Sequence, residues 1–425
     1  MRILVFAYAC EPDAGSEPGT GWVWARMLAR LGETWVITRS NNREVIEREL
    51  VKLEERERLH FVYVDLPPWA RFWKRRKRGL RPYYLLWQAA AARRARRLNH
   101  TVRFDVAWHV TFGNAWLGSL APLTGLPFVY GPVGGGVGVP WRLMPAFGPR
   151  GALFELLRAG ARSAGRYLNP FARLAWRHAR LILVENVETR DWLPMRYRTK
   201  AAIFPNTVID EIPHVRHRLT GAKTSLFVGR LVPWKGAAFA IRAVATLPEW
   251  RLLICGTGRD EPRLRHLVAR LGIEPRVRFL GTLARDDVFR VMQEDADVLV
   301  FPSFHDEGGY VVAEALVCGL PIVCLDRGGP PAIAGEAASV VSGTSDAGAI
   351  VADLSRVLAA EAFAHRETIE ARARELLLEN RVERLNELAC AAGLSVAEEP
   401  AQGAMGAPLP RMGTTPAPGR GGSHP

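Results

Sequence analysis

The sequence predicts an α/β protein of two doubly wound domains that face each other across a cleft, followed by a disordered tail. Short apolar runs rich in β-branched residues alternate with stretches of helical spacing, as buried parallel strands alternate with helices. This alternation occurs in two consecutive series of similar size, separated by a polar stretch. The 425 residues are also enough for two domains of ordinary size.

The first series is expected to form an N-terminal domain over residues 1–212. A stretch such as TGWVWARMLARLG (20–32) has the length and spacing of a helix between strands. The predicted strands are RILVFAY (2–8), TWVITRS (34–40), HFVYVDL (60–66), FDVAWHVT (104–111), PFVYGPV (127–133) and LILVENV (181–187).

The second series is expected to form a C-terminal domain over residues 213–396, which includes charged helices near the end. The polar stretch 210–224 is predicted as a linker, and the Pro/Gly-rich residues 397–425 as a disordered tail. The predicted strands are SLFVGRL (225–231), RLLICGTG (251–258), VRFLGTL (277–283), ADVLVFPS (296–303), PIVCLDRG (321–328) and ASVV (338–341).

The composition favours a cytoplasmic protein. No run of 18 apolar residues predicts a membrane span. The apolar start MRILVFAY is short and leads into CEPDAGSEPG, which lacks the cleavage pattern of a signal peptide. The five cysteines are scattered without a CxxC pair, so neither a disulfide framework nor a zinc site is predicted.

A strongly basic segment at 69–103 carries most of the net charge of +14. It contains twelve Lys or Arg residues, no acidic residue, and interleaved Trp, Phe and Tyr side chains. Such a segment suits an anionic membrane surface, and we expect peripheral binding at the inner face of the plasma membrane. A nucleic-acid surface and an ordinary solvated helix are the alternatives, but no nucleic-acid-binding motif accompanies the segment.

Two carboxylates lie eight residues apart in HDEGGYVVAEALVCG (305–319). Asp306 is in a loop after a predicted strand, and Glu314 is one turn inside the helix that follows. A loop acid of this kind often only caps its helix. However, Gly308 and Gly309 leave amides uncovered at the helix entrance, and a carboxylate on an apolar helix needs a partner. Both acids could accept hydrogen bonds from the hydroxyl groups of a sugar ligand.

The stretch FVGRLVPWKG (227–236) places two cations after the first strand of the second series. Arg230 follows Gly229, and Lys235 precedes a glycine at the start of a predicted helix. This pair suits a diphosphate, because Arg offers a fork of donors and Lys a point charge. Two surface cations in an ordinary loop are the alternative.

Three weaker signals lie in the N-terminal domain. The glycine-rich EPDAGSEPGTGW (11–22), with Gly15, Ser16 and Gly19, could close over a phosphate or an acceptor, although it is not a dinucleotide fingerprint. GPVGGGVG (131–138) is similar in composition. His109 ends a predicted strand and could face the cleft, or it could be structural.

Taken together, these motifs resemble glycosyltransferase family 4, whose members are retaining enzymes with the GT-B fold of two Rossmann-like domains. The resemblance covers the chain from its start to about residue 390. VGRLVPWKG resembles the diphosphate-binding loop of the family, DEGGYVVAEALVCGLPIV resembles its Glu-x7-Glu motif, and FPNTVI resembles the usual close of its first domain.

The resemblance implies a nucleotide-sugar donor bound by the C-terminal domain and an acceptor bound by the N-terminal domain. Arg230 and Lys235 would hold the diphosphate, Glu314 the ribose, and Asp306 the transferred sugar, with His109 near the reacting carbon. No metal or other cofactor is expected, because the two cations already neutralise the diphosphate. The implied donor contacts are Gly229, Arg230, Lys235, Gly256, Leu283, Asp306, Gly308, Gly309, Tyr310, Val311 and Glu314.

Asp306 departs from the family pattern, in which the first acid is usually Glu. The neighbouring Glu307 could substitute, although it lies one residue too close to Glu314.

From the resemblance and the basic segment, we expect a retaining transferase acting on a lipid-linked or polysaccharide acceptor in cell-surface or exopolysaccharide synthesis. The alternatives are a GT-B phosphorylase or epimerase, and a catalytically silent nucleotide-sugar-binding partner of a polysaccharide assembly complex.

Overall fold

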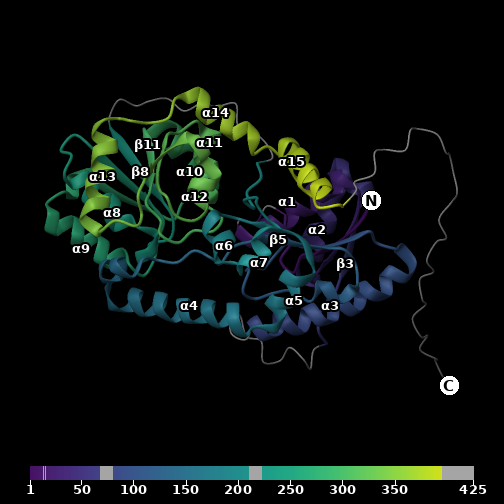
Figure 1. The fold of residues 1–425 in the computed structure, drawn as a ribbon. Coiled ribbons are helices and arrows are strands. Elements are labelled where there is room, and N and C mark those ends of the chain that lie inside the picture. Colours follow the sequence, from purple (N-terminus) through teal and green to yellow (C-terminus); the bar gives the residue numbers. More distant parts are fainter. Residues whose placement is uncertain (13, 15, 68–79, 210–222, 395–425) are drawn as a thin grey trace, which may run out of the picture.

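The computed structural model describes residues 1–12, 14, 16–67, 80–209 and 223–394 (Figure 1). Its first sheet has seven parallel strands in the order β3-β2-β1-β4-β5-β6-β7. Its strands are β1 Arg2–Phe6, β2 Glu33–Thr38, β3 Leu59–Tyr63, β4 Val106–His109, β5 Phe128–Val133, β6 Ala179–Val184 and β7 Ala201–Ile203. The helices of this first domain are α1 Ser16–Leu31, α2 Arg43–Leu50, α3 Leu80–Val102, α4 Gly148–Leu168, α5 Pro170–His178, α6 Val187–Trp192 and α7 Met195–Arg198.

The second sheet has six parallel strands in the order β10-β9-β8-β11-β12-β13. They are β8 Thr224–Val228, β9 Arg251–Cys255, β10 Val277–Gly281, β11 Val298–Phe301, β12 Ile322–Leu325 and β13 Ala338–Val341. The helices are α8 Ala237–Ala245, α9 Glu261–Leu271, α10 Arg285–Arg290, α11 Tyr310–Cys318, α12 Gly329–Ala334, α13 Ala347–Ala359, α14 Arg366–Glu375 and α15 Leu378–Ala391. Both sheets are doubly wound, which confirms the predicted fold class.

The strands form where continuous apolar runs were predicted, because helices cover both faces of each sheet. Every residue of β4, β5, β11 and β12 is buried. In each sheet the strand order reverses beside the first strand, between β1 and β4 and between β8 and β11. Loops at the carboxyl ends of strands beside such a reversal are where ligands bind in doubly wound sheets.

The last helix, α15, differs from the prediction that the terminal helices complete the C-terminal domain. Leu378, Leu385 and Ala389 on α15 are buried in the core of the N-terminal domain, together with residues of α1. The chain therefore crosses between the domains twice. The two crossing segments pair with each other, because Leu378 N donates to Ile209 O and Ile209 N donates to Leu376 O, both at 2.9 Å. Figure 1 shows α15 lying on the N-terminal domain, beyond α14.

Only part of the basic segment 69–103 lies among the described residues. On α3, Tyr83, Tyr84 and Trp87 are buried in the core, so these aromatic side chains are not available to a membrane, contrary to our expectation. The arginines at 93, 94, 96 and 97 are exposed. Within the described residues, no helix is both long enough and apolar enough to span a membrane. The predicted linker and the predicted disordered tail lie almost wholly outside the described residues.

Candidate active site

The two predicted cations lie where β8 ends. Gly229 has a φ of +156°, and it turns the chain toward Arg230. Arg230 is exposed, and its guanidinium has no polar partner among the described residues. Gly236 ends the short 3-10 helix Pro233–Lys235 with a φ of +80°, and a Cβ there would lie 1.9 Å from Pro302 O. Only glycine fits such a position, so Lys235 is held at a fixed place beside the loop that follows β11.

Asp306 lies against Lys235, and the two side chains form an ion pair. The second carboxylate oxygen of Asp306 accepts a hydrogen bond from Gly309 N at 3.2 Å. Gly309, the residue directly before α11, has a φ of +45°. The first-acid position of the motif and the predicted diphosphate cation are therefore in direct contact at a helix N-terminus, which is favourable for anions.

Glu314 has a partner that we did not predict. Its Oε1 lies 3.3 Å from Nε of Arg285, at the start of α10. Burial raises the pKa of Glu314, and the charge of Arg285 opposes that rise. Since Arg285 is largely exposed, its side chain can move aside at little energetic cost when a ligand hydroxyl approaches Glu314.

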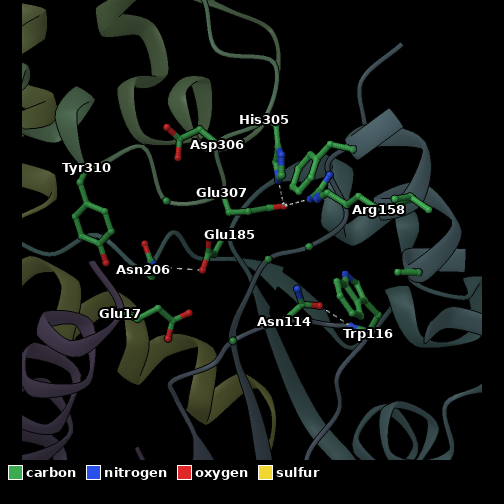
Figure 2. A pocket seen from close by; sticks show the side chains of 17 residues that line it. Glu17, Asn114, Trp116, Arg158, Glu185, Asn206, His305, Asp306, Glu307 and Tyr310 are labelled. Carbon is green, nitrogen blue, oxygen red and sulfur yellow. Dashed lines mark hydrogen bonds and ion pairs between the residues drawn. The ribbon is translucent and has the colours of Figure 1, made fainter. Parts of the chain in front are cut away.

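A pocket of about 620 Å³ opens between the two domains. Its walls come from the carboxyl ends of first-domain strands, from α4, and from the loop after β11 (Figure 2). Of the predicted donor residues, Asp306, Gly308 and Tyr310 line it. The other lining residues are Glu17, Gly113, Asn114, Trp116, Gly134, Gly135, Phe154, Leu157, Arg158, Ala161, Glu185, Asn206, His305 and Glu307.

Glu185 is a buried carboxylate in the wall of this pocket that our sequence reasoning missed. It follows β6 directly, and its Oε1 accepts a hydrogen bond from Asn206 Nδ2 at 3.1 Å. Its Oε2 is buried and has no hydrogen-bond partner in the described part of the chain. Burial, together with the nearby carboxylates of Glu307, Glu17 and Asp306, raises the pKa of Glu185 well above its usual range. The raised pKa favours the protonated form of Glu185, which can donate a hydrogen bond as well as accept one.

Glu307 points away from Asp306 and into the N-terminal domain (Figure 2). Its Oε2 accepts a hydrogen bond from Asn186 Nδ2 at 3.0 Å, and its Oε1 lies 3.4 Å from Nη2 of Arg158. Glu307 therefore ties the two domains together, whereas Asp306 occupies the side of the loop that faces Lys235. This geometry favours Asp306 over Glu307 as the counterpart of the family's first acid.

The glycines of GPVGGGVG are explained by close packing behind the pocket. A Cβ on Gly136 would lie 2.3 Å from Cα of Thr189, and one on Gly134 would lie 2.8 Å from Oε2 of Glu307. The backbone here also accepts hydrogen bonds from Arg158 and Arg162 of α4. These glycines let the loop after β5 pass between α4, α6 and the C-terminal domain.

His109 does not face the pocket. It is 1% exposed at the end of β4. Its Nδ1 lies 2.9 Å from Ser119 Oγ and its Nε2 lies 3.2 Å from Tyr84 Oη. Burial lowers the pKa of His109 to about 4, so the ring is neutral. This placement agrees with the structural alternative for His109 and differs from a position against the sugar ring.

The remaining predicted residues fall into two groups. Gly256 has a φ of +129°, and a Cβ there would lie 2.1 Å from Gly229 O, so it allows the loops after β8 and β9 to touch. Leu283 is half-buried against the core, and Val311 packs there too. Gly15 lies outside the described residues, Ser16 begins α1, and Gly19 packs that helix against Ala14 O. From this helix Glu17 reaches the pocket.

Comparison with known proteins identifies the second domain. Residues 208–376 match the family model described as glycosyl transferases group 1. The C-terminal domain is therefore similar to the glycosyl transferases group 1. Over 115 residues the chain is 39% identical to a D-inositol 3-phosphate glycosyltransferase from Mycolicibacterium gilvum, covering 26% of each chain. Over 136 residues it is 38% identical to a protein of that name from Corynebacterium glutamicum, covering 29% of this chain and 32% of the relative. The match therefore spans only a quarter to a third of these curated relatives.

Solved structures extend the likeness to both domains. HepE from Anabaena, in complex with UDP and glucose, has a TM-score of 0.56 at 16% identity, covering 92% of this chain and all of the other. The apo lipopolysaccharide outer core galactosyltransferase WaaB has a TM-score of 0.60 at 13% identity, with coverage of 92% and 99%. At these identities the likeness concerns the fold alone. It agrees with the GT-B arrangement of two facing Rossmann-like domains that we expected for this chain.

The residues that sequence reasoning missed lie on the N-terminal side of the pocket. Glu185, Asn206 and Asn114 each follow a strand at the carboxyl edge of the first sheet. A usable signal existed, because a polar residue directly after a buried parallel strand lies at the ligand-binding edge. Arg158 gave no such signal, since its role depends on which face of α4 turns inward.

Proposed function

We propose that the protein transfers a sugar from a nucleoside-diphosphate sugar to the hydroxyl group of a lipid-linked or polysaccharide acceptor, with retention of configuration. The observation that carries this proposal is the position of Asp306. It contacts Lys235 of the cationic loop on one side and lines the interdomain pocket on the other. A sugar bound at Asp306 would thus be joined to a diphosphate at Arg230 and Lys235 and would face an acceptor in the pocket.

The charges explain how such a donor would be activated. Breaking the sugar–phosphate bond leaves negative charge on the diphosphate, which Arg230, Lys235 and the amides at the start of α11 are placed to receive. One preorganised donor of this kind contributes roughly 3 kcal/mol of transition-state stabilisation. Because these groups supply the positive charge, we propose that the reaction needs no metal. Glu314 would accept hydrogen bonds from the ribose hydroxyls.

The lining of the pocket supports an acceptor group that is neutral and hydroxylated. Glu17, Glu185 and Asp306 place carboxyl groups there, while Arg158 lies beside Glu307 and Glu155. An anionic acceptor group would lie beside Asp306, which is unfavourable, whereas the carboxyl group of Glu185 can exchange hydrogen bonds with a hydroxyl group. Phe154, which stacks on Trp234 with one face and is 41% exposed, offers aromatic surface to a sugar ring. This differs from the acceptor in the name of the inositol 3-phosphate relatives.

We further propose that the reaction takes place at the cytoplasmic face of the plasma membrane. It would serve cell-surface or exopolysaccharide synthesis. The lipopolysaccharide galactosyltransferase activity in the name of WaaB, which shares the fold, is compatible with it.

The test is thermal melting of the wild type with UDP, GDP and ADP and with their common sugar conjugates. A ligand at 100 times its dissociation constant stabilises by about 2.7 kcal/mol, which gives a readable shift. We expect one nucleotide to stabilise the wild type and the matched variant Glu361→Ala, but to have a much smaller effect on Glu314→Ala. Slow release of that nucleotide from its sugar conjugate would then show donor activation. No shift with any nucleotide would contradict the proposal.

A further inference from the structure

Helix α4 presents its apolar side to solvent along most of its length. Ten residues between positions 153 and 168 are exposed, and Ser163 is the only one with a polar functional group apart from the hydroxyl of Tyr167. Leu156 is 62% exposed, Leu157 66% and Leu168 75%. We call these residues the α4 ridge: Leu153, Phe154, Leu156, Leu157, Gly160, Ala161, Ser163, Ala164, Tyr167 and Leu168.

Beyond its first turn, which carries the exposed Arg150, the charged side chains of α4 point the other way, into the protein. Glu155 is buried, Arg158 Nη1 donates to Val137 O at 2.8 Å, and Arg162 Nη1 donates to Gly136 O at 3.1 Å. The guanidinium of Arg166 lies 5.7 Å from the ring centre of Trp192. A surface helix normally buries its apolar face and exposes its polar face. Because these inward contacts fix the rotation of α4, the helix cannot turn to hide the ridge.

The surroundings of the ridge are positively charged. Five of the eight arginines in residues 141–180 are exposed, and the single acidic residue of that range, Glu155, is buried. Arg142 and Arg150 are exposed near the start of α4, and Trp141 beside them is 74% exposed. An apolar helix face flanked by arginines and an exposed tryptophan has the chemistry that binds the interface of an anionic bilayer.

The ridge is continuous with the interdomain pocket. Phe154, Leu157 and Ala161 belong to the ridge and also line the pocket. In Figure 1, α4 runs along the lower edge of the molecule, beneath the C-terminal domain and toward α5. A bilayer against this edge would therefore lie beside the pocket mouth.

We propose that the α4 ridge docks the protein on an anionic lipid bilayer. Docking in this way places the pocket at the membrane surface, so that an acceptor group can enter while its lipid chain stays on the ridge. The statement about the acceptor rests on the proposed function, but docking itself does not. The membrane contact thereby shifts from the basic segment 69–103, whose described aromatic residues are buried, to α4.

The experiment is co-sedimentation of the full chain with vesicles of phosphatidylcholine alone or mixed with phosphatidylglycerol. The test variant combines Leu153→Gln, Leu156→Gln and Leu168→Gln, which are on the ridge but not in the pocket wall. The matched control combines Leu123→Gln, Leu271→Gln and Val340→Gln, exposed apolar residues elsewhere. A third variant changes the arginines at 93, 94, 96 and 97 to Gln.

We expect the wild type and the control to bind the mixed vesicles. The ridge variant should partition at least about ten-fold more weakly, because three leucine side chains that would be buried in the bilayer are replaced by glutamine. The proposal is overturned if the wild type does not sediment with vesicles, or if the ridge variant binds them as the control does. It is also overturned if only the α3 arginine variant loses binding. A wild-type dimer that the ridge variant converts to monomer, without vesicle binding, would assign the ridge to a second copy instead.

A second measurement protects the test against misfolding of the triple variant. In a Cys390→Ser background, a polarity-sensitive dye on Leu156→Cys should brighten with the mixed vesicles, and a dye on Leu123→Cys should not. Equal response at both positions would overturn the proposal. Nucleotide-dependent melting is recorded for every variant. Loss of that response together with intact vesicle binding would count against the proposed function only.

Discussion

The ammonium group of Lys235 is ion-paired with the carboxylate of Asp306, at the point where the two functional halves of the site meet. A diphosphate and Asp306 would compete for the same cation. Binding of the donor would thus free Asp306 to turn toward the transferred sugar. The pair links recognition of the diphosphate to recognition of the sugar.

Substitutions of this pair should have opposite effects on nucleotide affinity. Lys235→Met should weaken binding of the nucleoside diphosphate by about ten-fold or more, because a hydrogen bond to a charged group contributes roughly 1.5–3 kcal/mol. Asp306→Asn should strengthen that binding while slowing sugar transfer. Calorimetric titration with the nucleotide found by melting would measure both. Lys223→Met, which removes a lysine paired with Glu361, is the control, and equal losses at both lysines would refute the assignment.

Glu314 and its partner Arg285 should differ sharply in their effect on nucleotide binding. Glu314→Ala should weaken binding of a ribonucleotide by about 1.5–3 kcal/mol, since the hydrogen bonds to the ribose are lost. Arg285→Ala should leave binding unchanged or slightly tighter, because the exposed arginine only competes for the carboxylate. A 2′,3′-dideoxynucleotide should bind the wild type and Glu314→Ala equally. A strong preference of the alanine variant for the ribonucleotide would exclude the ribose role.

Glu185 should make the folded protein less stable as the pH rises. Its folded-state pKa is raised by burial and by neighbouring carboxylates. Its contribution to the free energy of unfolding is therefore present at low pH and is lost as the pH rises through that pKa. Glu185→Gln should remove this loss, which melting curves from pH 5 to 9 would reveal, while the exposed Glu367→Gln should leave it unchanged. If Glu185 also orients the acceptor, the variant should bind nucleotide normally and transfer sugar more slowly.

His109 should contribute stability that disappears in acid. Its pKa is lowered from 6.5 to about 4, so the folded state resists protonation that the unfolded chain accepts. Between these values the wild type should lose roughly 3 kcal/mol of unfolding free energy. His109→Gln should flatten this part of the profile, whereas exposed His178→Gln should not. Denaturant titrations at pH 7, 5.5 and 4 would measure the slopes, and parallel slopes for wild type and His109→Gln would refute the prediction.

The strands could be predicted from the sequence because a parallel strand covered on both faces must be apolar throughout. The second-domain motifs could be found for a similar reason, since the positive φ of Gly229 and the close contact at Gly236 restrict those positions to glycine. The partner of Glu314 could not be predicted, because Arg285 reaches it from a different helix. Likewise, nothing local distinguishes His109 buried behind Tyr84 from a histidine facing a cleft.

Helix α4 and helix α15 show a second limit. The apolar residues of α4 recur with helical spacing, which predicts a helix but would ordinarily assign that face to the core. Only the hydrogen bonds of Arg158 and Arg162 to the loop after β5 reveal that the helix is turned the other way. In α15, the apolar stripe of Leu378, Leu385 and Ala389 would suit either domain, and the chain path alone decides between them.

The return of the chain to its first domain makes the C-terminal domain an insertion rather than an appendix. Its two connections are bonded to each other at Ile209 and Leu377, so they act as one two-stranded hinge. We expect such a hinge to favour opening and closing of the cleft over other motions between the domains.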